Sequence, residues 1–228
     1  MKFKHGVTQS YNELHGVKNS ETPLDSLQLR GKKNIIMNEI NFTEDLRQAL
    51  NVLIKGGIIL YPTDTIWGLG CDATNQDAVE RIFKIKKRRE SKSLIILVNG
   101  FTMLERYVRN IPEVAGEILD VSDKPLTIIY SEGKNLAPGV CNEDGSIGIR
   151  VCRDDFCNEL ITRFRKPLIS TSANFSEAQS PSHFSEIDDE IIRSTDYVVK
   201  YRQADTNKNT PSSIIKIEDN GVIKIIRK

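Results

Sequence analysis

The stretch that most constrains this chain runs from Gly56 to Asp72 and reads GGIILYPTDTIWGLGCD. The apolar run 58–61 has the length and composition of a buried strand, and Pro62 ends it. Thr63, Asp64 and Thr65 follow at once, so hydroxyl groups and a carboxylate stand at the carboxyl end of that strand. Open α/β sheets hold their ligands at this edge. An ordinary strand and turn explain the same residues, and the turn chemistry alone favours that simpler interpretation.

Hydrophobic periodicity predicts helices and strands that alternate without a strict βαβ repeat. We expect helices over residues 43–55, 75–89, 101–108, 112–119, 154–164 and 187–192. We expect strands over residues 58–61, 93–98, 126–130, 147–151, 168–171, 197–200, 213–217 and 222–226, the last two joined by an Asp-Asn-Gly turn. The predicted fold class is therefore α/β, with a twisted mixed sheet flanked by helices.

Residues 1–36 lack either periodicity and are rich in Asn, Ser, Lys and Gly, which predicts a poorly ordered N-terminal tail. The remaining residues, 37–228, form one expected domain. Met37 directly precedes the first periodic element, so we also hypothesise that it is the true start of translation. A native protein whose measured mass begins at Met1 would exclude that hypothesis.

The overall composition narrows the function classes. The chain has 32 basic and 31 acidic residues and a net charge of +1, so no global field favours nucleic acid, and any basic surface is local. Four cysteines, Cys71, Cys141, Cys152 and Cys157, lack zinc-type pairing and indicate reduced thiols in a cytoplasmic protein. No apolar run approaches the length that spans a membrane, so we expect no membrane partner.

Several well-known catalytic motifs are missing from the sequence. It has no P-loop and no Gly-x-Ser-x-Gly elbow. Its three histidines, His5, His15 and His183, are too scattered to suggest a histidine-dependent triad or a histidine-rich metal site, and we predict no metal ligands.

The strongest local charge feature is the run Lys84, Lys86, Lys87, Arg88, Arg89 and Lys92. Most such runs are solvated helix faces. Lys86, however, continues the apolar stripe of Val79, Ile82 and Phe83, so it should point inward and need an anionic partner. Arg88 and Lys92 follow at the predicted helix end, in reach of a phosphate.

Residues 62–70 resemble the Pro-Thr-Asp/Glu-Thr-x-aromatic-Gly-Leu-Gly signature of the YrdC-like family, the threonylcarbamoyl-AMP synthases. Further blocks that resemble family motifs follow in the family's order at 82–94, 124–127, 147–152, 170–174 with 179–182, and 211–215, and Arg227 matches a closing arginine. The chain departs from the family at Arg89, Ser93 and Cys152, where the motifs have proline. The resemblance spans residues 41–227 and fits the short form of the family.

The resemblance implies a YrdC/RibB-like fold with an open concave cleft. It also implies an enzyme that joins L-threonine, bicarbonate and ATP into threonylcarbamoyl-AMP and releases pyrophosphate. ATP would be a substrate and would arrive with Mg²⁺. A tRNA-modifying threonylcarbamoyltransferase machinery would then pass the threonylcarbamoyl group to an adenosine of tRNA.

The same resemblance assigns roles to individual residues. Lys86 and Arg88 would be catalytic. ATP would contact Arg88, Lys92, Thr127, Ser172, Asn174, Ser180 and Arg227, and threonine would contact Thr63, Thr65, Arg150, Ser170 and Ser212. Several of these residues also have an ordinary structural interpretation. Thr127 fits a common strand threonine, Arg150 a surface salt bridge, Ser172 and Asn174 turn residues after a strand, and Ser180 a helix cap.

Two other functions stay open at this stage. One is an RNA-binding paralogue of the same fold without synthase activity, which the three missing prolines keep in consideration; it would bind RNA in a salt-dependent manner. The other is a carbamoyltransferase that uses carbamoyl phosphate, since related domains occur in hydrogenase maturation factors.

Overall fold

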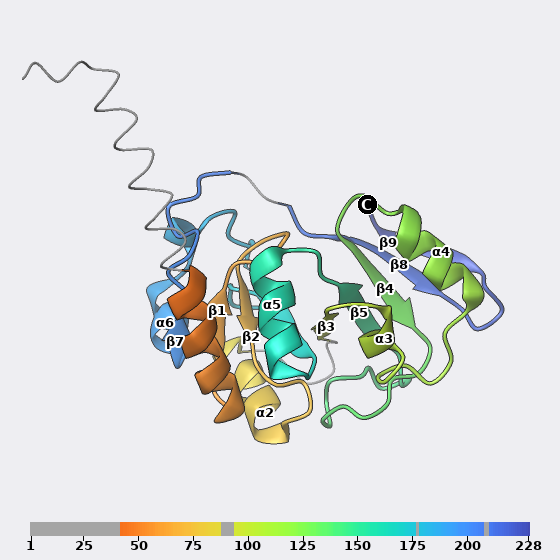
Figure 1. Cartoon of the computed structure of the whole chain (residues 1–228), viewed down its shortest axis with the longest axis horizontal. Coiled ribbons are helices and arrows are strands. Elements are labelled where there is room, and N and C mark those ends of the chain that lie inside the picture. The colour runs from red at the N-terminus through yellow and green to blue at the C-terminus, as the bar shows by residue number, and fades with distance from the viewer. Residues whose placement is uncertain (1–41, 88–93, 177, 208–209) are drawn as a thin grey trace, which may run out of the picture. The chain divides into compact units, whose positions relative to one another are not determined.

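The structure is a computed structural model, and it describes residues 42–87, 94–176, 178–207 and 210–228 of the 228-residue chain (Figure 1). The predicted tail, residues 1–36, and the proposed start at Met37 lie outside the described residues. All the elements described below belong to the unit Asn38–Lys228.

In the described residues, nine strands form one mixed sheet in the order β7-β1-β2-β6-β3-β5-β4-β8-β9. The strands are β1 (Ile59–Tyr61), β2 (Gly68–Gly70), β3 (Ile95–Val98), β4 (Leu126–Tyr130), β5 (Ile147–Val151), β6 (Leu168–Ser172), β7 (Tyr197–Val198), β8 (Ser213–Ile217) and β9 (Ile223–Arg227). The pairs β1–β7, β3–β5 and β4–β8 are parallel, and the other neighbouring strands are antiparallel. The predicted mixed sheet is confirmed.

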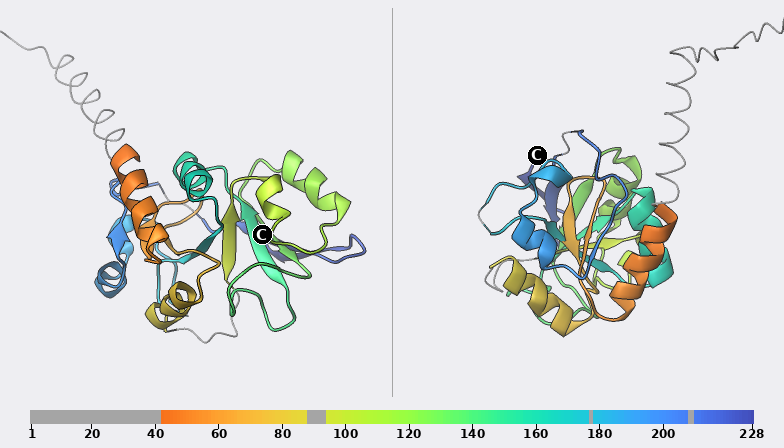
Figure 2. Two further views of the ribbon diagram at one scale, coloured as in Figure 1. Left: turned by 60° about the horizontal axis from the view of Figure 1, so that its bottom comes forward. Right: turned by 90° about the vertical axis from the view of Figure 1, so that its left-hand side faces the viewer.

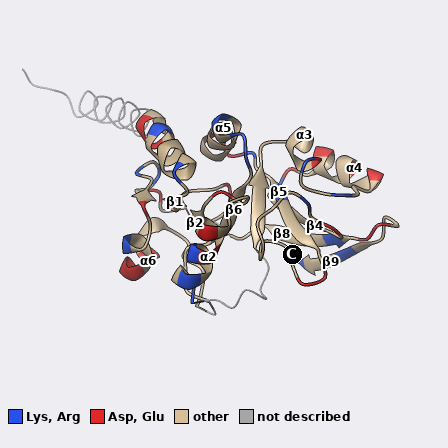
Figure 3. Cartoon of the chain, turned by 90° about the horizontal axis from the view of Figure 1, so that it is seen from below, with Lys and Arg blue, Asp and Glu red and all other residues tan. Residues whose placement is uncertain are grey.

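Most of the helices lie along one face of this sheet, and α2 and α6 lie on the opposite face (Figure 3). Residues 42–54 are helical, and the labelled helices are α2 (Gln76–Ile85), α3 (Phe101–Leu104), α4 (Glu113–Val121), α5 (Asp155–Phe164) and α6 (Asp189–Arg193), with a 3₁₀ turn at Phe184–Glu186. Seen edge-on, helix 42–54, α5, α3 and α4 follow one another along the same face, while α2 and α6 lie at the β7–β1 end (Figures 2 and 3). The other face therefore stays open over β3, β5, β4 and β8.

The strand register explains why the two faces differ. Thr127 pairs with Arg150 and with Ile214, and Gly148 pairs with Ile95, which in turn pairs with Ser170. Paired residues point to the same face of a sheet, so these small and polar side chains share the open face. The alternate positions, such as Ile96, Ile128 and Ile149, are buried beneath the helices. The alternation along each strand thus builds a core on one side and a polar surface on the other.

Local sequence signals set the starts of the two longest labelled helices. Asn75 caps α2 by accepting a hydrogen bond from the backbone N–H of Ala78, and Asp154 caps α5 in the same way at Cys157. On α5, the residues 156, 157, 160 and 161 are buried, which is the spacing of one helical face. Helix α2 ends at Ile85, four residues before the predicted end, because Lys87 adopts a left-handed φ of 50°.

Sequence reasoning missed one strand, β2, because its Gly-Leu-Gly sequence is typical of a turn. The glycines are needed by the packing: a Cβ on Gly70 would lie 2.6 Å from Cε1 of Tyr61 and 3.1 Å from the carbonyl oxygen of Ile169. Tyr61 is fully buried and its hydroxyl donates to that same carbonyl oxygen. The ring of Tyr61 therefore occupies the space that a side chain on β2 would fill.

Two carboxylates, the buried Asp45 and the more exposed Asp196, attach β7 and its flanking residues to the rest of the fold. Asp45, on helix 42–54, accepts hydrogen bonds from the hydroxyl of Tyr197 and from the backbone N–H groups of Lys200 and Tyr201. Asp196 accepts one from the backbone N–H of Ile58, at 2.7 Å, just before β1. These contacts hold the short edge strand β7, which has only one neighbour.

The expected free thiols are confirmed: all four cysteines are unpaired, and only Cys141 is partly exposed. Within the described part of the chain, no helix has both the length and the apolar character needed to cross a membrane.

We predict that Gly70→Ala destabilises the protein by about 1–3 kcal/mol, because the new methyl group overpacks against Tyr61. Gly116→Ala is the matched control. It lies inside α4, its Cβ would meet no atom closer than 3.9 Å, and removal of a helical glycine should add roughly 0.5–1 kcal/mol. Urea unfolding of the two variants checks the prediction. Equal stability of both variants would show that Tyr61 yields to the methyl group.

Candidate functional site

A cavity of about 300 Å³ opens on the polar face of the sheet. Its lining comes from β2, β3, β4, β5, β6, β8 and β9, and from the segments that follow β1, follow β6 and precede β8. Eight of the predicted site residues line it: Thr65, Thr127, Arg150, Ser170, Ser172, Ser180, Ser212 and Arg227. Segments that are far apart in the sequence therefore meet at one place.

The turn after β1 meets β5 in this cavity through a chain of hydrogen bonds. Arg150 donates from Nη1 to the hydroxyl of Thr65 at 3.2 Å, and the hydroxyl groups of Thr65 and Thr63 lie 3.0 Å apart. The hydroxyl of Thr63 in turn donates to the carbonyl oxygen of Ile66 at 2.8 Å. Both threonines are buried, so the turn has a fixed shape.

Asp64, between those two threonines, forms an ion pair with Arg150. Its Oδ1 lies 3.1 Å from Nη2 of Arg150, and both side chains are largely buried. Burial raises the pKa of Asp64 above its ordinary value, and the positive charge of Arg150 only partly offsets that effect. Sequence reasoning gave Asp64 no site role, although its place between two predicted ligands was a usable signal.

A second cluster of polar contacts lies on the β4–β8 side of the cavity. The hydroxyl groups of Thr127 and Ser212 are 2.8 Å apart, and both residues are buried. Arg227, on β9, donates from Nε and Nη2 to the carbonyl oxygen of Ser212. Partial burial and the nearby charge of Arg150 lower the pKa of Arg227. Two guanidinium groups thus face one cavity, an arrangement that favours anions.

Lys86 lies at the end of α2, and it is buried as the sequence predicted. Its ammonium group donates to the carbonyl oxygens of Ser172 and Asn174, at 2.5 and 2.7 Å, and lies 3.4 Å from Oδ1 of Asn174. The backbone of Lys86 also accepts a hydrogen bond from Ser176. Lys86 therefore ties α2 to the turn that follows β6, directly beside the cavity.

The remaining predicted residues fall into two groups. Thr63, Lys86 and Asn174 contact lining residues from behind but do not line the cavity themselves. Arg88 and Lys92 lie outside the described residues. Ser180 lines the cavity. The helical element that follows it in the described chain is the 3₁₀ turn Phe184–Glu186, which begins after His183, so Ser180 does not cap an α-helix.

Sequence reasoning missed the apolar part of the lining. Trp67, Ile95, Ile129 and Ile214 lie between the polar groups, and Trp67 packs on Phe184 with ring centroids 4.9 Å apart. The alternation of side chains along a strand could have identified such residues. Ile129, for example, is two residues from the predicted site residue Thr127, so the two side chains point to the same face of the sheet. Polar groups set among apolar side chains are typical of a small-molecule site.

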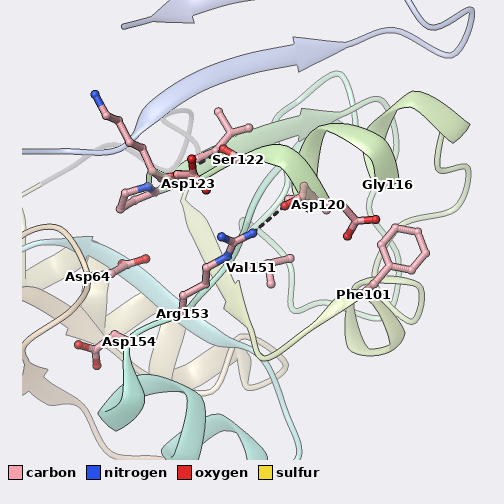
Figure 4. Close-up of a pocket in the computed structure, with 13 residues that line it drawn as sticks. Asp64, Phe101, Gly116, Asp120, Ser122, Asp123, Val151, Arg153 and Asp154 are labelled. Carbon is pink, nitrogen blue, oxygen red and sulfur yellow. Dashed lines mark hydrogen bonds between the residues drawn. The ribbon is translucent and has the colours of Figure 1, made fainter.

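A second cavity, of about 600 Å³, lies on the helix-covered side of the sheet (Figure 4). Phe101, Leu119, Leu126 and Val151 give it apolar walls, and Asp64, Asp120, Asp123 and Asp154 add carboxylates. Arg153 crosses this space and donates to the carbonyl oxygen of Leu119 at 2.7 Å. Asp64 therefore borders this cavity while it contacts Arg150 of the first one.

Comparison with known proteins adds independent findings. A family model for the Sua5, YciO and YrdC proteins, described as "Telomere recombination", matches residues 51–228. A putative threonylcarbamoyl-AMP synthase of Methanocaldococcus jannaschii is 34% identical over 86% of this chain and 93% of its own length. The threonylcarbamoyl-AMP synthase of Pseudoalteromonas translucida is 33% identical over 77% of this chain and 94% of its own.

A solved structure has the same fold. It is Sua5 of P. abyssi complexed with L-threonine, which superposes with a TM-score of 0.68 at 24% identity. The match covers 75% of this chain but only 50% of the Sua5 chain, so this chain spans about half the length of that protein.

We predict that Lys86→Met destabilises the protein by roughly 2–3 kcal/mol, because the carbonyl oxygens of the turn after β6 lose a charged donor. Lys84→Met is the matched control, since Lys84 lies on the same helix and is exposed. Thermal unfolding and amide hydrogen exchange at residues 172–176 measure the effect. Equal melting temperatures for the two variants would contradict the role of Lys86 in holding the turn.

Proposed function

This chain belongs to the Sua5/YciO/YrdC family, and from that premise we propose that it is a threonylcarbamoyl-AMP synthase. It condenses L-threonine, bicarbonate and ATP into threonylcarbamoyl-AMP and releases pyrophosphate, which makes it a nucleotidyltransferase. Relatives that carry this name match it over nearly their whole length.

One observation carries the proposal further than the resemblance. Residues from five motif blocks, together with the closing Arg227, converge on a single cavity, and the resemblance to the synthases had assigned each of them to the site. The cavity joins two guanidinium groups, several hydroxyl groups and apolar side chains. It therefore suits a zwitterionic amino acid beside an anionic nucleotide better than it suits an uncharged ligand.

This reaction depends more on the positioning of its substrates than on reactive side chains of the protein. The amine of threonine and bicarbonate give a carbamate with loss of water, and a carbamate oxygen then attacks the α-phosphorus of ATP. The bond from that phosphorus to the bridging oxygen breaks, and pyrophosphate leaves with the electron pair. Negative charge on phosphate oxygens is stabilised by fixed cations, and the reaction needs no covalent enzyme intermediate.

The residues divide between the two substrates. Thr63, Thr65, Arg150, Ser170 and Ser212 bind and orient threonine, whose carboxylate pairs with Arg150. On the nucleotide side, the contacts come from Thr127, Ser172, Asn174, Ser180 and Arg227.

The cations act at the triphosphate. Arg88 and Lys92 bind its oxygens, and Lys86 adds charge while it shapes the turn beneath the nucleotide. Among the described residues, no cluster of three His, Cys, Asp or Glu side chains could hold a metal ion. We propose that Mg²⁺ enters with ATP, held by the phosphates and by water, which is how this ion usually binds.

The product is a mixed anhydride of a carbamic and a phosphoric acid and is prone to hydrolysis. A cytoplasmic threonylcarbamoyltransferase that modifies tRNA is the proposed acceptor. The RNA-binding alternative has no comparable support, because the polar groups described above line a cavity of small-molecule size.

We predict that the purified protein releases pyrophosphate from ATP and Mg²⁺ only when both L-threonine and bicarbonate are present. Arg88→Ala should lower the rate by about 10²-fold, because one positioned cation is lost from the developing phosphate charge. Arg193→Ala is the control for a lost arginine, since Arg193 is 73% exposed on α6. A coupled pyrophosphate assay, with each component omitted in turn, measures this.

The alternatives give different results in the same assay. Pyrophosphate release that does not depend on L-threonine would exclude L-threonine as the substrate. No release from folded protein, together with salt-dependent binding of tRNA, would favour the RNA-binding paralogue.

A further inference from the structure

We infer that Asp64 is a positioning residue, which orients Arg150 and fixes Thr65 as a hydrogen-bond acceptor for the substrate. The inference rests on the proposed function, because it names how the site holds L-threonine. It concerns a carboxylate that does not line the cavity itself but forms an ion pair with Arg150, which does.

The first step is the geometry of Arg150. Only 5% of its side chain is exposed. Nη1 donates a hydrogen bond to Thr65, and Nη2 forms an ion pair with Asp64, whose Oδ1 lies 3.1 Å away without accepting a hydrogen bond. A guanidinium group is planar and its donors are fixed in one fork, so two anchored nitrogens determine where the third one lies. Asp64 supplies the only charged anchor of Arg150 among the described residues.

The second step is the third nitrogen. Nε of Arg150 is buried and has no hydrogen-bond partner in the described part of the chain. A buried donor without a partner is rare in folded proteins and is often found at a functional site. Because Arg150 lines the cavity, its guanidinium group can donate to an oxygen of a bound ligand there. A carboxylate is the ligand group best matched to a guanidinium donor.

The third step is the direction of each hydrogen bond in the turn. The hydroxyl of Thr63 donates its proton to the carbonyl oxygen of Ile66, so it can only accept from Thr65. The hydroxyl of Thr65 therefore donates to Thr63 and accepts from Arg150. Its one remaining lone pair can only accept. Thr65 should thus receive an N–H or O–H of the substrate, and the threonine amine is such a donor.

These steps together give a two-point recognition of an amino acid. The guanidinium group of Arg150, which is paired with Asp64, donates to the carboxylate. Oγ1 of Thr65, which already accepts from Nη1 of Arg150, accepts from the amine. A carboxylate at position 64 costs free energy of folding, because burial disfavours its charged form. A neutral residue would fill the turn but would not anchor the guanidinium group.

The test compares Asp64→Asn with a matched control, Asp123→Asn. Asp123 lines the same second cavity as Asp64 (Figure 4), but it is exposed, and among the described residues the ion pair of Arg150 is with Asp64 and not with Asp123. We expect Asp64→Asn to raise the KM for L-threonine about tenfold while the KM for ATP changes less than twofold. Asp64→Glu, which keeps the charge, should recover most of the affinity, and Asp123→Asn should match the wild type.

Calorimetric titration with L-threonine alone separates this inference from the proposed function. Weaker threonine binding by Asp64→Asn, with an unchanged melting temperature, supports the positioning role whether or not pyrophosphate is released. A lower melting temperature with an unchanged affinity and KM for threonine would show a purely structural role and overturn it. A wild-type protein that neither binds threonine nor releases pyrophosphate would overturn both the inference and the proposed function.

Discussion

The alternation of side chains along paired strands is the constraint on which the rest of this structure depends. Thr127, Ile129, Gly148 and Arg150 face one way, and their neighbours in sequence face the helices. A slip of one residue between β4 and β5 would send Arg150 into the core and a buried isoleucine into the cavity. Register, and not any single catalytic group, therefore assembles the site. This also explains why the site motifs are spread over the sequence: each strand contributes only the two or three positions that face outward.

The charges around the cavity are held by very different partners. Lys86 is held by backbone carbonyl oxygens, Arg227 by the carbonyl oxygen of Ser212, and Arg150 by a carboxylate. Carbonyl oxygens satisfy the donors of a cation but leave its charge in place. Arg227 therefore keeps a field that a ligand anion can use, while Asp64 offsets part of the charge of Arg150. A site of this kind is pre-organised, because contacts within the protein fix its donors.

Sequence patterns could predict most of the fold but not all of the site. The strand at 147–151 and the hairpin at the end were predictable because alternation and turn residues agree there. Strand β2 was not, since its glycines reflect the ring of Tyr61, a contact that no local pattern contains. The inward direction of Lys86 was predictable from helical spacing, whereas its carbonyl partners come from a loop 86 residues away. The role of Asp64 was hidden for the same reason: its partner lies on a different strand.

Cys152 stands where the family motif has proline. Its contacts in the structure indicate whether this difference weakens the site. Cys152 directly follows Arg150 and Val151, and its backbone N–H donates to the carbonyl oxygen of Val98 at 2.9 Å. Proline has no such donor, so this chain gains a hydrogen bond that continues the β3–β5 pairing beyond the strand ends. The thiol is buried, next to Cys157, whose own thiol donates to the carbonyl oxygen of Pro62 at the start of the threonine turn. A proline stiffens a chain by fixing φ, and here a hydrogen bond and a packed side chain restrain the same residue from outside. The departure therefore changes how the end of β5 is held, and Arg150 keeps its place two residues earlier.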